Sequence, residues 1–248
     1  LSEELGQRKD YVENVITLLD EGNTVPFIAR YRKEMHGAMD DQAIRNLADR
    51  LAYLRNLEAR RQEVKTSIEN QGKLTEELSH AIDEAKTLAE VEDIYRPYKQ
   101  KRRTRATIAR EKGLAPLAEL LYAQEPDCPV PEEAAKDYVN EEKGVSSVEE
   151  ALAGASDIIA ETISDDADVR KDLRALYNEW ADVVSVAAEK EPKDTVYRNY
   201  YAFSAAVNQI QGHQVLAVKR GEKVGVLKVS VVLSRDAALA GVYRRVIK

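Results

Sequence analysis

The chain has almost none of the residues that build disulfides or metal sites. Its 248 residues include one cysteine, Cys128, so no disulfide can form within the chain, and the three histidines, His36, His80 and His213, are scattered. We therefore expect no structural zinc, no other bound metal and no cofactor. A single cysteine is also typical of a reducing, cytoplasmic compartment.

Long apolar runs are missing as well. No stretch approaches the roughly 20 apolar residues that span a bilayer, and the N-terminal sequence Leu-Ser-Glu-Glu-Leu is too polar for a signal peptide. The composition therefore predicts a soluble protein that is not exported and has no membrane partner. Because the chain begins at Leu1 rather than methionine and ends just after a basic stretch, we expect a fragment of a longer protein.

Motifs that carry catalysis are absent. The sequence has no Walker A loop, no Gly-x-Gly-x-x-Gly, no His-Glu-x-x-His, no Gly-x-Ser-x-Gly and no paired Cys-x-x-Cys. Asp165, Asp166 and Asp168 follow Ser164, and this order favours acids in the first turn of a helix over a metal site. Cys128 has no histidine nearby in the sequence to act as a base. We predict a protein that is not an enzyme.

Charge is abundant and unevenly distributed. The net charge is −7, yet residues 1–110 are neutral, residues 111–195 carry −14 and residues 196–248 carry +7. Within this acidic chain, residues 95–110 hold seven cations and no acid. Crowded cations repel one another, so the segment needs screening by nucleic-acid phosphates, by carboxylates of the same chain, or by water and counterions.

We predict that this basic segment contacts nucleic-acid phosphates without base specificity. Tyr95 and Tyr98 add aromatic faces suited to stacking on single-stranded bases, although a tyrosine at a helix end is commonly half-buried, as we expect for Tyr95. The alternative is a protein-interaction module whose basic segment docks on acidic surfaces of its own chain or of a partner. The candidate nucleic-acid-binding residues are Arg96, Lys99, Lys101, Arg102, Arg103, Arg105 and Arg110.

A second segment, residues 24–33, interleaves aromatic and cationic side chains in the same way. It reads Thr-Val-Pro-Phe-Ile-Ala-Arg-Tyr-Arg-Lys. Phe27 and Ile28 within it are predicted to be core residues.

The pattern up to Trp180 is mainly helical, because apolar residues recur three and four positions apart. Residues 2–5, Gly6 and the next helix have the size of a helix-turn-helix, which is a weak signal for DNA reading. Asp40 and Asp41 open a helix of about 30 residues, and a helix that long predicts an elongated multi-helix assembly. The expected N-caps of later helices are Thr75, Thr87, Ser147 and Ser164.

Prolines and a change of pattern divide the chain. Pro97 ends the helix before the basic segment, whose later part should form one or two helical turns before Gly113. A Pro-rich linker starts at Pro126. We predict a helical domain over residues 1–125, a helical continuation over 126–180 and a mixed segment with short strands over 181–248.

The mixed segment contains one clear strand signal. Residues 224–232 are rich in nearly alternating valines and predict a strand. Residues 214–218 either pair with it as a hairpin or form a short helix that ends at Gly221 and leaves a lone strand. Val183, Val184 and Val186 are too few to decide between helix and strand. The fold class is therefore mainly α, with a small β element near the C-terminus.

Two stretches resemble the signature sequences of the bacterial Tex family of transcription accessory proteins. They are residues 24–34, Thr-Val-Pro-Phe-Ile-Ala-Arg-Tyr-Arg-Lys-Glu, and residues 93–110, which contain the basic segment. Leu-Leu-Asp-Glu-Gly at 18–22, Arg-Gly at 220–221 and Gly-Val-Leu at 225–227 continue the match, so the resemblance spans nearly the whole chain.

The resemblance implies a nucleic-acid-binding transcription factor related to a eukaryotic elongation factor and histone chaperone. Such proteins have a helical N-terminal region, then a ribonuclease-H-like domain, helix-hairpin-helix elements and an oligonucleotide-binding barrel, and this chain resembles the N-terminal region only. Because the family's main nucleic-acid contacts are associated with the barrel, the implied role here is a scaffold with an auxiliary phosphate-contacting surface and weak binding. The resemblance also implies contacts with the transcription machinery.

Overall fold

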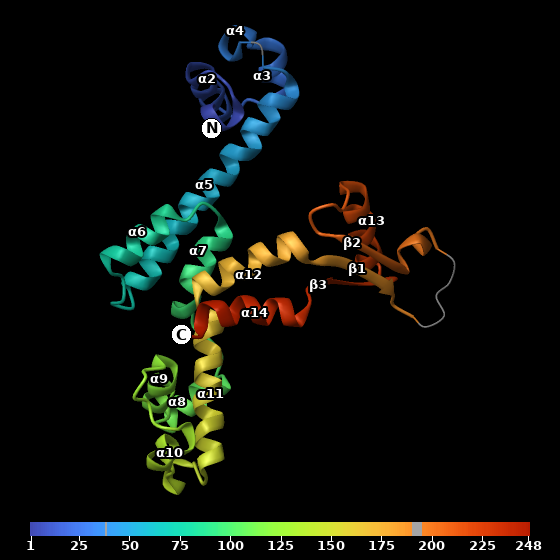
Figure 1. Ribbon diagram of the computed structural model, residues 1–248. Coiled ribbons are helices and arrows are strands. Elements are labelled where there is room, and N and C mark those ends of the chain that lie inside the picture. Colours follow the sequence, from blue (N-terminus) through green and yellow to red (C-terminus); the bar gives the residue numbers. More distant parts are fainter. Residues whose placement is uncertain (38, 190–194) are drawn as a thin grey trace. The chain divides into compact units, whose positions relative to one another are not determined.

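A computed structural model describes residues 1–37, 39–189 and 195–248, which divide into two units at Tyr95 (Figure 1). The described residues form fourteen α-helices and one three-stranded sheet near the C-terminus. The mainly α class, the long helix and the small β element are confirmed.

The division of the chain at residues 125 and 180 stays a prediction. The two units extend over residues 1–95 and 96–248, and residues 190–194 of the predicted mixed segment lie outside the described residues. Each unit is built around its own buried side chains.

Seven helices make up the first unit. Its N-terminal part has a core that includes Val15, Ile28 and Ile44, each fully buried. In Figure 1 the short helices of this part gather around the first turns of the long helix α5. The elements are α1 (Ser2–Leu5), α2 (Lys9–Asp20), α3 (Val25–Tyr31), α4 (Lys33–His36), α5 (Asp41–Glu69), α6 (Glu76–Glu84) and α7 (Leu88–Tyr95).

Helix α5 confirms the predicted long helix. It runs for 29 residues and starts where the side chain of Asp40 accepts a hydrogen bond from the Ala43 amide at 2.7 Å. At its other end α5 packs against α6 and α7, where Ile68 and Val91 are fully buried. The predicted N-caps at Thr75 and Thr87 are also confirmed by their hydrogen bonds to backbone amides.

Replacing Asp40 by alanine is expected to lower the free energy of unfolding by about 0.5–2 kcal/mol, because the first turn of α5 loses its side-chain acceptor. Urea unfolding followed by circular dichroism measures the change. Asparagine at the same position keeps an acceptor at the cap and should restore most of the loss. An alanine variant as stable as the wild type would contradict this role.

Helix α1 is a single turn that ends at Gly6, which has a left-handed conformation with φ of 61°. The DNA-reading role of α1 and α2 stays a prediction. Over the described residues, no helix combines the length and the apolar character required to cross a bilayer.

The second unit begins with helices, continues into the sheet and ends with helix α14. Its helical core includes Leu114, Leu117 and Ala155, which are buried where α8 and α9 lie along α11. Its elements are the 3₁₀ turns η1 (Arg96–Tyr98), η2 (Ala135–Tyr138), η3 (Glu141–Lys143) and η4 (Arg198–Tyr200), the helices α8 (Arg105–Glu111), α9 (Ala115–Ala123), α10 (Pro131–Ala134), α11 (Val148–Asp165), α12 (Ala167–Trp180), α13 (Gly212–Lys223) and α14 (Arg235–Val246), and the strands β1 (Asp182–Ala187), β2 (Ala202–Ala206) and β3 (Leu227–Val232).

The junction between α11 and α12 differs from the sequence prediction. Ser147 caps α11 as expected, but the predicted cap at Ser164 is wrong because α11 continues to Asp165. Asp166 instead adopts an extended conformation and accepts a hydrogen bond from the Val169 amide at 2.8 Å. A carboxylate is at least as good an N-cap as a serine hydroxyl, so the break falls two residues later.

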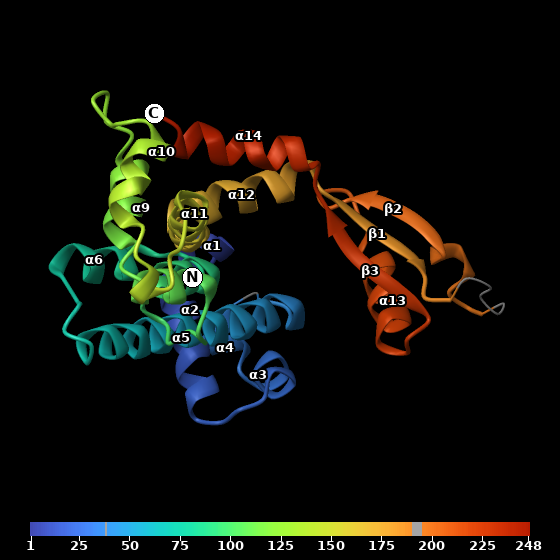
Figure 2. The same ribbon diagram turned by 90° about the horizontal axis from the view of Figure 1, so that it is seen from below.

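The sheet has the order β2-β1-β3 and both pairings are antiparallel. Ser185 in the central strand is opposite Phe203 on one side and Val229 on the other. The strand predicted over 224–232 begins only at Leu227, because Val224 caps the end of α13. It is not alone, because residues that the sequence left undecided pair with it. Figure 2 shows the three strands side by side, with α13 close to them.

The hairpin alternative for residues 214–218 is wrong. These residues belong to α13, which continues two residues past Gly221 and packs on β3. Gly221 lies against Leu227, where a Cβ atom would collide with the leucine side chain. Gly221 thus allows α13 and β3 to pack closely, and it does not end the helix.

Candidate nucleic-acid interface

The basic segment has the local structure that its sequence predicts. Pro97 lies in the 3₁₀ turn η1, and the chain then runs without regular structure to Thr104. The Thr104 hydroxyl caps α8 by accepting a hydrogen bond from the Thr107 amide at 3.0 Å. Helix α8 ends just before Gly113, whose φ of 86° terminates it.

Tyr95 is the first residue of the basic segment and the last residue of the first unit. Its hydroxyl lies 2.8 Å from the Ser67 hydroxyl, and the guanidinium carbon of Arg60 lies 5.5 Å from the centre of its ring. The side chain is half-buried, which confirms the structural role expected for it.

Helix α8 lies against α11 because the facing residues are small. Ala106 and Ala109 of α8 are buried there, and a Cβ atom at Gly154 of α11 would collide with Leu114. This close approach brings the cations of the segment next to one face of α11. Asp157, Glu161 and Asp165 are spaced four residues apart and share that face.

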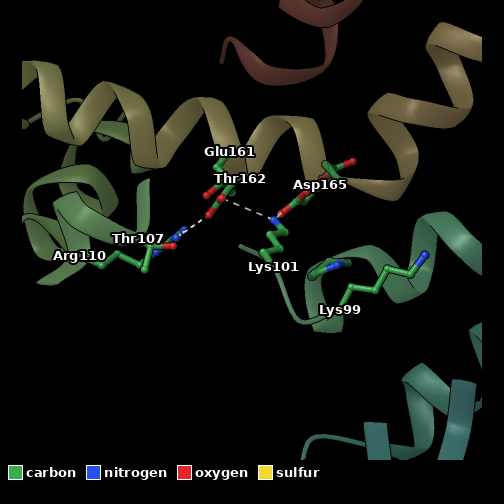
Figure 3. Close-up of a pocket in the computed structure, with 9 residues that line it drawn as sticks. Lys99, Lys101, Thr107, Arg110, Glu161, Thr162 and Asp165 are labelled. Atoms are coloured by element: carbon green, nitrogen blue, oxygen red, sulfur yellow. Dashed lines mark hydrogen bonds and ion pairs between the residues drawn. The ribbon is translucent and has the colours of Figure 1, made fainter. Parts of the chain in front are cut away.

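Four cations of the segment form ion pairs with these three carboxylates. Figure 3 shows Lys101 reaching between Glu161 and Asp165, with Arg110 on the other side of Glu161. The contacts are Arg96 to Asp165 at 3.1 Å, Lys101 to Asp165, Lys101 to Glu161 at 3.6 Å, Arg105 to Asp157 at 3.2 Å and Arg110 to Glu161 at 2.5 Å. A cavity of about 550 Å³ lies beside them, lined also by Pro97, Lys99 and Thr162.

Glu161 is the centre of this arrangement. Its side chain is 16% exposed, and it accepts hydrogen bonds from Arg110 and from the Thr104 hydroxyl at 2.9 Å. Burial alone would raise the pKa of Glu161, but the two hydrogen bonds and the charges of Lys101 and Arg110 outweigh it, so its pKa is lowered. Glu161 therefore stays ionised and holds the segment on α11.

The remaining cations are more open to solvent. Arg102 is exposed and has no partner within the described ranges. Arg103 pairs with Glu111 at 2.6 Å and its side chain is 67% exposed, while the Arg105 side chain is 85% exposed despite its contact with Asp157. We call Arg96, Lys101 and Arg110 the inner cations and Arg102, Arg103 and Arg105 the outer cations. Lys99 lines the cavity in Figure 3.

Sequence reasoning did not identify the acidic partners individually. It treated residues 111–195 as one acidic region, although the four-residue spacing of Asp157, Glu161 and Asp165 was a readable signal of one helix face. Asp165 was expected to support a helix start, but it pairs with Arg96 and Lys101 while Asp166 makes the cap. In the part of the chain that the structure describes, no group of His, Cys, Asp and Glu is arranged to hold a metal ion.

Comparisons with known proteins agree along both units. Residues 1–69 match the Tex-like protein N-terminal domain, and residues 127–247 match the Tex central region-like family. The chain is similar to Protein YhgF of Escherichia coli, with 45% identity over 92% of this chain and 29% of that protein. It is also similar to Transcriptional accessory protein Tex of Neisseria gonorrhoeae, with 43% identity over 95% of this chain and 31% of that protein.

A more distant similarity reaches a human protein. S1 RNA-binding domain-containing protein 1 of Homo sapiens is 31% identical over 89% of this chain and 23% of that protein. The chain spans about a third of the length of the curated relatives it matches, or less. Because two Tex family matches together cover most of its residues, the chain belongs to the Tex family of transcription accessory proteins.

Proposed function

We propose that the chain is a non-catalytic scaffold region of a cytoplasmic transcription accessory protein, and that its outer cations form an auxiliary surface for nucleic-acid phosphates. The proposal rests on the difference in burial and pairing between the inner and the outer cations of the basic segment. Glu161 and Asp165 pair with the inner cations and fix the segment on α11. Arg103 and Arg105 each pair with one carboxylate but stay mostly exposed, and Arg102 is unpaired in the described residues. The names of the relatives, which include an RNA-binding protein and a transcriptional accessory protein, support the same class of partner.

The charge balance favours a polyanion at this surface. Four carboxylates, Glu111, Asp157, Glu161 and Asp165, face six cations of the segment, so positive charge remains after pairing; these cations are Arg96, Lys101, Arg102, Arg103, Arg105 and Arg110. Contacts made by these side chains would address phosphates rather than base edges, and so would carry no sequence specificity. The ion pairs of the inner cations with α11 hold the segment in place, and the outer cations carry the positive charge that remains.

Replacing Arg102, Arg103 and Arg105 together by alanine is expected to weaken nucleic-acid binding and to flatten the dependence of log affinity on log salt concentration. Each phosphate that is no longer bound should reduce the slope by up to about 0.9 on duplex DNA and about 0.7 on a single strand. Fluorescence anisotropy across a salt series measures both quantities for RNA and for DNA.

A matched control removes the same charge elsewhere in the second unit. Lys136, Lys143 and Lys171 are exposed and lie outside the basic segment, so their combined replacement by alanine should leave the slope almost unchanged. Equal slopes for the wild type and the outer-cation variant would overturn the phosphate role.

A second candidate function is a protein-interaction module, which is favoured by the ion pairs between the basic segment and α11. Here the segment organises the acidic region into a surface for a protein of the transcription machinery. The outer-cation variant would then bind nucleic acid like the wild type and bind purified RNA polymerase less tightly. Measuring both ligands with the same variants separates the two functions.

A further inference from the structure

Helix α3 of the first unit presents a second group of aromatic and cationic side chains. The helix buries Ile28 completely, whereas Tyr31 at its C-terminal end is 60% exposed. Phe27 is half-buried rather than a core residue, which corrects the sequence prediction, while Ile28 is core as expected. The residues of this surface, which we call the α3 patch, are Phe27, Arg30, Tyr31, Arg32 and Lys33.

Contacts within the α3 patch hold its aromatic rings in place. The ring centres of Phe27 and Tyr31 are 5.3 Å apart, with an angle of 45° between the ring planes. The guanidinium carbon of Arg32 lies 5.4 Å from the centre of the Phe27 ring, and Arg32 also donates a hydrogen bond to the Tyr31 carbonyl at 3.3 Å. These contacts brace the exposed tyrosine, so little side-chain freedom remains to be lost when a flat ligand stacks on it.

The cations of the α3 patch are not neutralised within the chain. Arg30, Arg32 and Lys33 form no ion pair with any carboxylate of the described residues, in contrast to the inner cations of the basic segment. Glu34 is the only acid between residues 24 and 39, so this stretch has an excess of positive charge.

Three acids on or next to the helices that pack against α3 are engaged elsewhere. Asp20 of α2 binds Arg55 through both oxygens, at 2.6 and 2.8 Å. Asp41 of α5 binds Arg45 at 3.0 Å, and Asp40 caps the helix. The positive charge of the α3 patch is therefore available to a ligand from outside.

We propose that the α3 patch is a binding site for single-stranded nucleic acid, with Tyr31 as the stacking platform and Arg30, Arg32 and Lys33 as phosphate contacts. Single strands suit this combination because their bases are free to leave the stack and their backbone carries a phosphate at every step. In a duplex the base faces are occupied by neighbouring pairs, and an acidic protein segment would use the cations but not the face of the ring. The proposal is independent of the outer cations, which lie in the other unit. An experiment can therefore disprove one of the two binding sites without disproving the other.

Fluorescence anisotropy of the whole 248-residue chain with labelled oligouridylate, oligothymidylate and a mixed-sequence duplex tests the proposal. Replacing Tyr31 by alanine should weaken binding of the single strands by about five- to a hundredfold and leave duplex binding nearly unchanged. Tyr31→Phe keeps an aromatic face and should bind like the wild type. Replacing Arg30 and Lys33 by alanine should lower the salt slope on a single strand by about 0.7 for each phosphate that is no longer bound.

The control is Tyr243→Ala, which removes a tyrosine of similar exposure, 55%, from α14. It should leave the affinity for all three ligands unchanged. Thermal unfolding of each variant confirms that the exposed substitutions leave the chain folded.

Three results would overturn the proposal. They are an unchanged single-strand affinity in Tyr31→Ala, an equal loss in the alanine and phenylalanine variants, and polyglutamate binding that depends on Arg30 and Lys33 as strongly as oligonucleotide binding does. The two single strands distinguish RNA from DNA as the preferred ligand.

Discussion

Replacing Glu161 by glutamine is expected to lower the free energy of unfolding of the second unit by about 1–3 kcal/mol at neutral pH. Glutamine has nearly the same shape and still accepts a hydrogen bond from Thr104, but it loses the charge that pairs with Arg110 and Lys101. Arg110 loses its carboxylate, whereas Lys101 keeps Asp165. Because Arg110 is 42% exposed, water screens part of the loss, so the effect is smaller than for a fully buried ion pair.

The effect of this substitution should depend on pH in a defined direction. The pKa of Glu161 is lowered in the folded chain, so the stabilisation is fully present above the ordinary glutamate pKa of 4.5. It is lost as the pH falls through the lower pKa of the folded state, where the protonated acid and glutamine become equivalent. The difference between wild type and Glu161→Gln should therefore be constant near neutral pH and shrink in strongly acidic solution.

Urea unfolding at a series of pH values measures this difference. Trp180, the single tryptophan, lies in the second unit, so its fluorescence follows that unit. Glu119 of α9 is exposed, and its carboxylate has no ion pair or hydrogen bond within the described residues. Glu119→Gln is therefore the matched control and should leave the free energy of unfolding almost unchanged. A difference that grows on acidification would contradict the role assigned to Glu161.

Replacing Gly37 by alanine should destabilise the first unit by about 2–5 kcal/mol. Gly37 follows α4 with φ of 65° and ψ of −127°, a conformation that residues with a Cβ atom rarely adopt. A Cβ atom there would also lie 2.5 Å from Cε2 of Tyr11, and this partly buried ring has little room to move. Because α4 directly follows α3, the substitution should also disturb the α3 patch.

Gly72 provides the control for this prediction. It has a similar φ of 67°, but no atom lies within 4 Å of the position of a new Cβ. Gly72→Ala should therefore cost only the backbone strain, about 1–2 kcal/mol. Thermal unfolding followed by circular dichroism compares the two variants. Equal losses of stability would mean that the contact with Tyr11 has no energetic weight.

Local features of the fold were predictable because they depend on neighbouring residues. Asp40, Thr75 and Ser147 cap helices as their side chains predict, since the hydrogen bond that a cap makes spans only three residues. The helix over residues 105–111 and its end before Gly113 follow from the same local rules.

The sheet was harder to predict because each of its strands is short. Residues 202–206 read Ala-Phe-Ser-Ala-Ala, which is a weak strand signal, and they become a strand only by pairing with β1. Helix α13 likewise continues through Gly221 because the glycine is packed against Leu227. Pairing and packing of distant segments decided both outcomes.

The sequence by itself determined the mainly helical class, the family resemblance, and two segments rich in cations and aromatic residues, since these follow from residue types and their spacing. Only the tertiary structure decided how those cations are used, because a charge is neutralised by whatever lies beside it in space. Packing of α8 on α11 places Asp157, Glu161 and Asp165 against the basic segment, whereas Arg30, Arg32 and Lys33 meet no carboxylate in the described chain. Carboxylates of its own unit thus neutralise part of the charge of the basic segment, whereas no carboxylate of the described chain pairs with the cations of the α3 patch.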